Sequence, residues 1–290
     1  MLDWSLPRED LAERLTHAPA APPSESELEA ETPAARSREQ LEAFRPRAHE
    51  RPQTPAARAR RLLRRLADLQ FDSINRDLKV LLPRVSGTLA DVGCGAQPFR
   101  DLLDPAVRYI PVDIQDSERH FGYHLTEVRR FRGSTLPLAD AEVSTVLCTE
   151  TLEHVADDER FLKELARALV PGGELILTMP FAARWHYVPQ DFRRYTPTAL
   201  KAILETAGFD QVRIYARGGA LAVAAYKVLG LVLTLWVGYG QRGAWALGAR
   251  LIALVLAPLA LLAALLGHWG LARPGPVEDT LGYTVLARRR

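Results

Sequence analysis

Apolar and polar positions alternate in a regular way through the middle of the chain. Short apolar runs fall at 88–92, 107–112, 143–149, 174–179 and 212–216. Amphipathic helical patterns lie between them, at 98–103, 158–170 and 197–207. Short buried strands separated by helices of this length are typical of βαβ units and a parallel sheet. The pattern therefore predicts an α/β fold with a Rossmann-like, mostly parallel sheet and helices on both faces.

The N-terminal part has a different pattern. Residues 17–57 are rich in Pro, Ala, Ser and Glu and poor in large apolar side chains. Such a segment buries too little surface to offset its ordering entropy, so we expect 1–57 to be a mobile or loosely docked arm. From 58 to 84, apolar residues recur at three- and four-residue steps and arginines crowd the other side, which predicts a helix. Its arginine face is a solvated surface or a contact with a membrane surface.

The most apolar stretches come late, within 219–276. They are Leu221–Tyr239, interrupted by Lys227, and Leu251–Leu266, which has about sixteen residues where a membrane span needs about 17–25. The strands on either side belong to one sheet, so the insert crosses a membrane twice or not at all. Arg242 and Arg250 near its tip resist translocation. The pattern favours a helical hairpin that dips into one leaflet; a two-span hairpin and an oligomer interface are the alternatives.

Composition narrows the function classes. A net charge of +2 over 290 residues is too small to indicate a nucleic-acid partner. The two cysteines, Cys94 and Cys148, lie in apolar strand-like contexts, which favours reduced thiols in a reducing compartment. The spacing of histidines, cysteines and acids matches no metal-ligand motif, so no metal is expected. The first residues lack the pattern of a signal peptide.

A glycine-containing turn carries the first chemical signal. The segment TLADVGCGAQPF (88–99) places Gly93 and Gly95 directly after an apolar strand and before a helical pattern. Glycine permits a tight turn and a close approach to a ligand, and a helix N-terminus offers free N–H groups. Asp113 ends the next strand, where a carboxylate can accept both hydroxyls of a ribose. The alternative is a purely structural turn that Asp113 caps.

Several motifs in order extend this signal: DVGCG, VDI, TLEHV, LVPGGELILTMPF and DFRRYT…LETAGF. Together they resemble the class I S-adenosylmethionine-dependent methyltransferases, most closely the bacterial methyltransferase type 11-like branch that is similar to quinone- and sugar-modifying enzymes. The resemblance covers 85–218 and 277–290. It implies a seven-stranded sheet with 219–276 inserted before the last strand, and S-adenosyl-L-methionine as the cofactor. It also implies that the glycine loop holds the methionine end of the cofactor and Asp113 its ribose.

The chain departs from the family pattern at three places. Gln97, followed by Pro98, stands where a third glycine is common. Gly133 and Ser134 stand where an acid near the adenine is usual, and 143–145 reads VST where Phe-Asp is usual. The adenine contacts therefore stay open. The residues expected at the cofactor are Asp91, Gly93, Cys94, Gly95, Asp113, Ser134 and Glu150.

The remaining chemistry is expected where the middle strands end, because ligands of open α/β sheets bind beyond the carboxyl ends of the strands. Methyl transfer depends mostly on alignment and desolvation, but a hydroxyl acceptor also needs a base. Histidine titrates in the useful range. His154 is the first candidate for the base, with His186 and Asp191 behind it.

These observations predict S-adenosylmethionine-dependent methyl transfer to a hydroxyl or similar nucleophile of a lipid-linked or other amphiphilic small molecule. We expect the protein at the cytoplasmic side of a bacterial inner membrane, in contact through 219–270, with no nucleic-acid partner; an oligomer is compatible with the sequence. A non-catalytic, membrane-attached module that binds S-adenosylmethionine is the second hypothesis. A nicotinamide oxidoreductase is the third, which the missing loop glycine and the PGG…TMPF context disfavour.

Overall fold

The computed structural model describes residues 54–115, 127–133, 135–187, 190–237, 243–272 and 279–290. The expected N-terminal arm lies outside the described residues as far as position 53, as do Ser134 and Arg242. All of the described residues belong to one compact unit, Leu41–Arg290.

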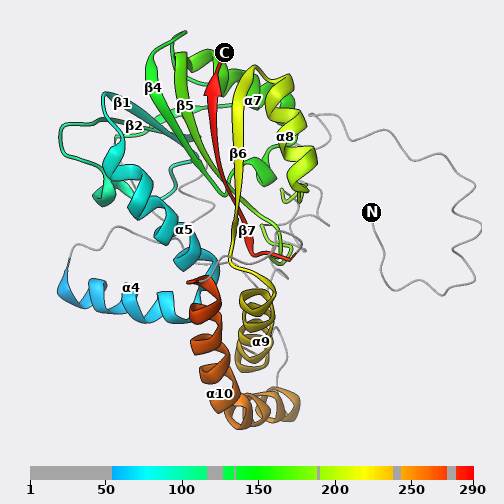
Figure 1. Ribbon diagram of the computed structural model, residues 1–290. Coiled ribbons are helices and arrows are strands. Elements are labelled where there is room, and N and C mark those ends of the chain that lie inside the picture. The colour runs from blue at the N-terminus through cyan, green and yellow to red at the C-terminus, as the bar shows by residue number, and fades with distance from the viewer. Residues whose placement is uncertain (1–53, 116–126, 134, 188–189, 238–242, 273–278) are drawn as a thin grey trace, which may run out of the picture. The chain divides into compact units, whose positions relative to one another are not determined.

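Seven strands form one sheet in the order β3-β2-β1-β4-β5-β7-β6 (Figure 1). Their bounds are β1 Thr88–Val92, β2 Arg108–Ile114, β3 Arg129–Phe131, β4 Val143–Thr149, β5 Leu169–Pro180, β6 Phe209–Arg217 and β7 Gly282–Arg289. Every strand pair is parallel except the two pairs that include β7. The prediction of a mostly parallel seven-stranded sheet is confirmed. The carboxyl ends of β1, β2, β4, β5 and β6 therefore share one edge, here called the carboxyl edge.

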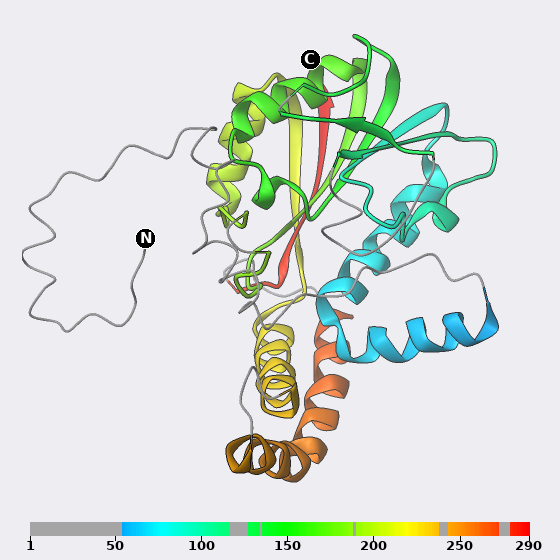
Figure 2. The same ribbon diagram turned by 180° about the vertical axis from the view of Figure 1, so that it is seen from behind.

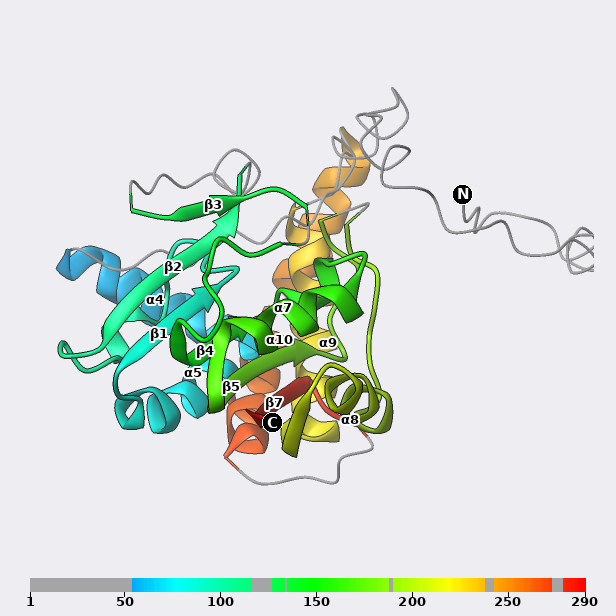
Figure 3. The same ribbon diagram turned by 90° about the horizontal axis from the view of Figure 1, so that it is seen from above.

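Helices cover both faces of the sheet (Figure 3). Helix α5 (Leu69–Leu81) packs its buried side chains against Leu89 and Leu147. Helices α7 (Asp158–Ala168) and α8 (Pro197–Thr206) pack on the other face, in the same cluster as Val146. Neighbouring residues of β4 thus contribute to different layers, as expected for a strand whose side chains alternate and whose two faces are both covered.

The region 58–84 forms two helices rather than one. Helix α4 (Pro55–Ala67) and α5 meet at Asp68. The 3-10 turn η2 (Leu82–Arg84) follows the C-terminal end of α5. The Asp68 side chain accepts a hydrogen bond from the Phe71 amide at 3.0 Å, which caps the start of α5. The expected helix at 98–103 is reduced to the 3-10 turn η3 (Arg100–Leu102).

The apolar insert forms two helices that pack against each other between β6 and β7. These are α9 (Ala220–Val237) and α10 (Ala244–Leu271), which confirms the inserted helical hairpin. Helix α10 has 28 residues. It extends beyond both ends of the apolar run Leu251–Leu266, so the length of that run is shorter than the length of the helix. Figures 1 and 2 show a sharp bend within α10. Pro258 lies inside the helix and accounts for the bend, because proline removes a backbone hydrogen bond and clashes with the preceding turn.

The base of the hairpin packs against α5. A Cβ atom at Gly267 would lie 2.9 Å from the Ala225 Cβ and 3.2 Å from the Leu69 Cδ2, so α10 approaches both neighbours closely. The buried carboxylate of Asp72 adds a polar fastening: it pairs with Arg76 at 2.8 Å and lies 3.2 Å from His268 Nδ1 on α10. The close packing at Gly267 and the contact between His268 and Asp72 both hold α10 against α5.

Candidate active site

The glycine loop follows β1 at the point where the strand order reverses. The amides of Gly93 and Cys94 both donate to the Val112 carbonyl, at 2.9 and 3.2 Å, so the loop continues from the β1–β2 pair. Gly93 has a φ of +75°, and a Cβ there would lie 2.9 Å from the Thr151 Cβ at the end of β4. A side chain at this position would therefore push the loop away from β4. Ligands of such sheets bind at this reversal point.

Two carboxylates stand behind the loop. Asp113 accepts from the Gly95 amide at 3.0 Å and from the Ile114 amide at 2.8 Å, so it holds the loop in place. Asp91 accepts from the Tyr109 hydroxyl at 2.6 Å, and its Oδ1 has no hydrogen-bond partner among the described residues. Burial raises the pKa of Asp91 to about 7; the Tyr109 hydrogen bond opposes the rise and the Asp113 charge adds to it.

Of the other residues expected at the cofactor, Cys94 belongs to this loop and Glu150 follows β4, while Ser134 lies outside the described residues. Cys94 is buried, and burial raises the pKa of its thiol, so the thiol stays neutral. Glu150 follows β4 with a φ of +47°, and its carboxylate accepts from the buried guanidinium of Arg217 at 2.7 Å. No sequence motif points to Arg217, because it ends β6 and meets Glu150 only in the folded chain.

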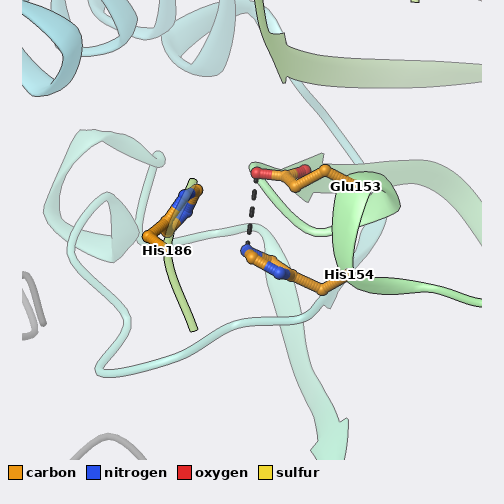
Figure 4. A group of neighbouring side chains, drawn as sticks. All are labelled: Glu153, His154 and His186. Atoms are coloured by element: carbon orange, nitrogen blue, oxygen red, sulfur yellow. Dashed lines mark ion pairs between the residues drawn. The ribbon is translucent and has the colours of Figure 1, made fainter. Parts of the chain in front are cut away.

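A second cluster, here called the His–Glu cluster, lies farther along the carboxyl edge. Glu153 and His154 come from the 3-10 turn η4 (Leu152–His154) after β4, and His186 from the loop after β5 (Figure 4). One potential ligand atom of each residue lies within 4.8 Å of the others. The two imidazole rings meet edge to face, with centroids 5.0 Å apart. The structure thus brings together the two histidines expected as bases, together with a glutamate that sequence reasoning did not select.

Backbone carbonyls set the orientation of both rings. His154 Nδ1 lies 2.5 Å from the Gln190 carbonyl oxygen, and His186 Nδ1 lies 2.8 Å from that of Arg184. A carbonyl oxygen only accepts, so in each ring Nδ1 carries a proton, and such a ring in its neutral form has its lone pair on Nε2. Burial lowers the pKa of His154 to about 4, which keeps this ring neutral near pH 7.

Glu153 has an unusual environment. Its side chain is fully buried, and neither carboxylate oxygen has a hydrogen-bond partner among the described residues. His154 Nε2 lies 3.7 Å from Glu153 Oε1. Burial, together with the charge of Glu150, raises the pKa of Glu153 well above its usual range. Unpaired buried carboxylates are costly, so this group calls for a chemical explanation.

Asp191 supports His186 from behind. Its carboxylate accepts from the His186 amide at 3.0 Å and from both terminal nitrogens of Arg194, at 2.5 and 2.8 Å. Burial raises the pKa of Asp191, but the hydrogen bonds from His186 and Arg194 outweigh it and hold the pKa well below its usual range. A carboxylate held so firmly in its ionised form is a poor proton acceptor and a good orienting group.

Part of this chain is similar in sequence to known proteins. Residues 90–177 match a family model described as a methyltransferase domain. The chain is 30% identical over 130 residues to a probable S-adenosylmethionine-dependent methyltransferase of Mycolicibacterium smegmatis, covering 41% of this chain and 51% of that protein. It is 30% identical over 165 residues to a ubiquinone biosynthesis O-methyltransferase of Cereibacter sphaeroides, covering 48% and 66%. The chain thus spans about half the length of the first of these relatives.

Solved structures with partial similarity include methyltransferases. A putative methyltransferase from an antibiotic biosynthesis pathway of Anabaena variabilis has a TM-score of 0.48 and 17% identity, covering 74% of this chain and 97% of that chain.

The strand order, the antiparallel last strand and the glycine loop at the reversal point define a Rossmann-like methyltransferase fold. The domain is a class I S-adenosylmethionine-dependent methyltransferase domain, which confirms the resemblance, and its cofactor is S-adenosyl-L-methionine. The nicotinamide oxidoreductase hypothesis has no support from these matches.

Proposed function

We propose that the protein transfers the methyl group of S-adenosyl-L-methionine to a hydroxyl or similar nucleophile of an amphiphilic or lipid-linked small molecule at a membrane surface. The acceptor oxygen forms a bond to the methyl carbon as the S–CH₃ bond breaks and its electron pair stays on sulfur. The hydroxyl loses its proton, and S-adenosylhomocysteine is released. The glycine loop and the His–Glu cluster support this proposal because both lie on the carboxyl edge.

Individual residues have different proposed roles. The glycine loop and Asp113 hold the cofactor, and Asp113 also keeps the loop in place through Gly95. His154 is the proposed proton acceptor, since its Nε2 carries a lone pair, and His186 is the second candidate. Asp191 positions His186. A base with a pKa of about 4 removes a hydroxyl proton poorly at neutral pH, so His154 needs help from another group.

The distribution of side chains on the hairpin carries the membrane part of the proposal. In α10 the buried positions are small: Ala246, Ala253, Ala263, Gly267 and Gly270. Large apolar residues point outward, among them Val255, Leu261 and Leu265, which are 79%, 64% and 61% exposed. Water favours the reverse arrangement, whereas helices in lipid pack through small residues and present large apolar ones to the acyl chains. Both helices are also long and apolar enough to cross a membrane.

The shape of the hairpin favours the shallow insertion expected from sequence. The bend at Pro258 divides α10 into two arms of about 20 Å each, shorter than the ~30 Å hydrocarbon core. Arg184 donates to the Thr234 hydroxyl at 3.0 Å, near the distal end of α9. A guanidinium is expensive to place at the centre of a bilayer. We therefore propose a hairpin that dips into one leaflet, on the cytoplasmic side.

Helix α4 fits a position in the membrane interface. It lies crosswise to the neighbouring arm of α10 (Figure 1). Its Leu62 and Leu66 are 59% and 49% exposed, and Arg58 is exposed as well. An amphipathic helix with arginines on its polar face binds in the plane of an anionic membrane surface. With the hairpin entering the leaflet, α4 would lie flat on that surface.

The loop that carries His186 is attached to the hairpin. Lys227 of α9 donates to the Ala182 carbonyl at 2.6 Å, and Arg184 reaches Thr234. Between these anchors and the His–Glu cluster, Trp185 is 62% exposed. An acceptor whose apolar part stays in the leaflet would meet this loop first, which supports an amphiphilic substrate.

The test is transfer of a labelled methyl group by the full-length protein, with a bacterial membrane extract as acceptor. We expect label in the organic fraction and little in the aqueous fraction. Label in the aqueous fraction alone contradicts the amphiphilic acceptor. Cofactor binding without transfer to either fraction contradicts the enzymatic function and favours the non-catalytic module.

A further inference from the structure

We infer that the His–Glu cluster, Glu153, His154 and His186, is a binding site for a divalent transition-metal ion, with Zn²⁺ the expected occupant. Its use in methyl transfer rests on the proposed function, whereas the binding of the ion does not.

The first argument is that one potential metal-ligand atom of each of the three residues lies within 4.8 Å of the others. The Nδ1–H group of each ring donates to a backbone carbonyl, so the lone pair of the neutral ring lies on Nε2. The third member is the Glu153 carboxylate, whose oxygens have no hydrogen-bond partner in the described part of the chain. A cation at their centre would take the place of any carboxyl proton and satisfy all three groups at once.

The second argument is the support behind the rings. His186 Nδ1 lies 3.1 Å from the Asp191 carboxylate in addition to the Arg184 carbonyl. Metal-bound histidines almost always donate their other N–H to a carboxylate or a backbone carbonyl, which fixes the ring and raises its basicity. Asp191 is itself clamped by Arg194. The cluster therefore has ligands and the groups that orient them.

The third argument is size and ligand type. Zinc bonds of about 2.0–2.2 Å place neighbouring ligand atoms of a tetrahedral site about 3.4 Å apart. His154 Nε2 and Glu153 Oε1 are already 3.7 Å apart, so small side-chain rotations, mainly of His186 on its loop, close the site. Two imidazoles and one carboxylate suit Zn²⁺ and leave a fourth position open, as in catalytic zinc sites.

The open position gives the ion a role in the reaction. An ion there would polarise the acceptor hydroxyl and ease the loss of its proton to water. The oxygen lone pair then forms the bond to the methyl carbon, and the S–CH₃ electron pair stays on sulfur. In this arrangement His154 acts as a ligand, and the hydroxyl is activated without a strong protein base.

The test uses the full-length protein in detergent, freed of metal with a chelator. Zn²⁺ alone is titrated by calorimetry, and Co²⁺ is titrated as a spectroscopic substitute through its visible absorption. The variants are His186→Ala and Glu153→Gln. The matched control is His268→Ala, a histidine that also contacts a buried aspartate but lies outside the cluster. Calorimetry with S-adenosylhomocysteine reports whether each variant keeps its fold.

We expect one Zn²⁺ per chain, with affinity reduced at least about 100-fold in His186→Ala and Glu153→Gln, because even the groups behind a ligand are worth 10–100-fold. His268→Ala should bind Zn²⁺ as the parent does. No stoichiometric Zn²⁺ or Co²⁺ binding by the parent overturns the site, as does an equal loss in the control. Zn²⁺ binding without methyl transfer to any extract supports the site and contradicts the proposed function.

Discussion

Arg217 Nη2 donates to Glu150 Oε1 at 2.7 Å and joins the last residue of β6 to the first residue after β4. The same guanidinium donates to the Met179 carbonyl at 3.1 Å and to the Ser73 hydroxyl at 2.9 Å. One buried side chain thus connects the ends of three strands with α5. Because Arg217 directly precedes the hairpin, it also couples the hairpin's base to the rim of the active site.

Replacing Arg217 with alanine should lower the free energy of unfolding by about 3–5 kcal/mol, because it leaves a carboxylate and two buried acceptors without their donor. Denaturant unfolding in detergent measures this. Arg213→Ala is the matched control, since Arg213 is an exposed residue of the same strand. Equal losses in both variants would contradict the structural role of Arg217.

Asp113→Ala should weaken binding of S-adenosylhomocysteine by about 3 kcal/mol or more. Two charge-assisted hydrogen bonds to the ribose, about 1.5–3 kcal/mol each at most, are lost, and the Gly95 amide loses its acceptor. Calorimetry gives the affinity. Asp113→Asn keeps one acceptor oxygen, so its affinity should lie between those of the parent and Asp113→Ala. Unchanged affinity in Asp113→Ala would remove this residue from the cofactor site.

His154→Ala should lower turnover by about 10²–10⁴ while cofactor affinity stays intact, whether the ring accepts a proton or holds an ion. Steady-state rates with the extract, alongside calorimetry of S-adenosylhomocysteine, separate the two effects. A rate within a few-fold of the parent would transfer the role to His186 or indicate catalysis by alignment alone.

The ion pairs of Asp72 should make the free energy of unfolding depend on pH in the acid range. Burial raises the pKa of Asp72, but Arg76 and Arg65 outweigh it and hold the folded-state pKa below its usual value of 3.8. The carboxylate therefore contributes stability above its unfolded pKa, and the contribution is lost as the pH falls through the folded value.

Denaturant midpoints of the parent and Asp72→Asn should differ clearly at pH 7 and converge below about pH 4. The groups that face Asp72 are Arg65, Arg76 and His268. A constant difference across this range would show that the charge of Asp72 is not the source of the stability.

The full-length protein should sediment with membranes, resist high salt and be released by detergent, since apolar burial is not screened as surface charge is. Replacing Leu261, Leu262 and Leu265 with glutamine should weaken vesicle binding about 100-fold, at about 1 kcal/mol for each half-exposed leucine. Leu200→Ala, in the sheet's core, is the control that should leave vesicle binding unchanged. A parent that stays soluble and oligomeric without detergent would favour the oligomer interface.

A cysteine at position 242 distinguishes the two membrane arrangements. Arg242 lies outside the described residues, between α9 and α10 in the sequence. With a shallow hairpin, a membrane-impermeant reagent added from the outer side should leave Arg242→Cys unlabelled. Full labelling from that side would contradict the shallow hairpin and establish two spans.

Much of this protein could be predicted from local sequence. Strand β1, its glycine turn and the acid at Asp113 follow from residue types at fixed positions along the chain, and so does the apolar insert. These features depend on backbone conformation and on burial of one face, and a short stretch of sequence is enough to predict both. Strand β3 was missed because its three residues, Arg129–Phe131, carry two arginines and show no apolar run.

The tertiary structure decided which distant residues meet. Glu153 and His186 come from separate connections, and only the parallel alignment of β4 and β5 places them around one point. The pairing of Arg217 with Glu150 likewise needs β6 to lie in the sheet with its carboxyl end at the same edge. In the hairpin, composition alone predicts two apolar helices, but only their packing reveals that small residues face inward and leucines outward. A local pattern specifies an element; the chemistry of a site depends on distances between elements, which the packing of the whole sheet sets.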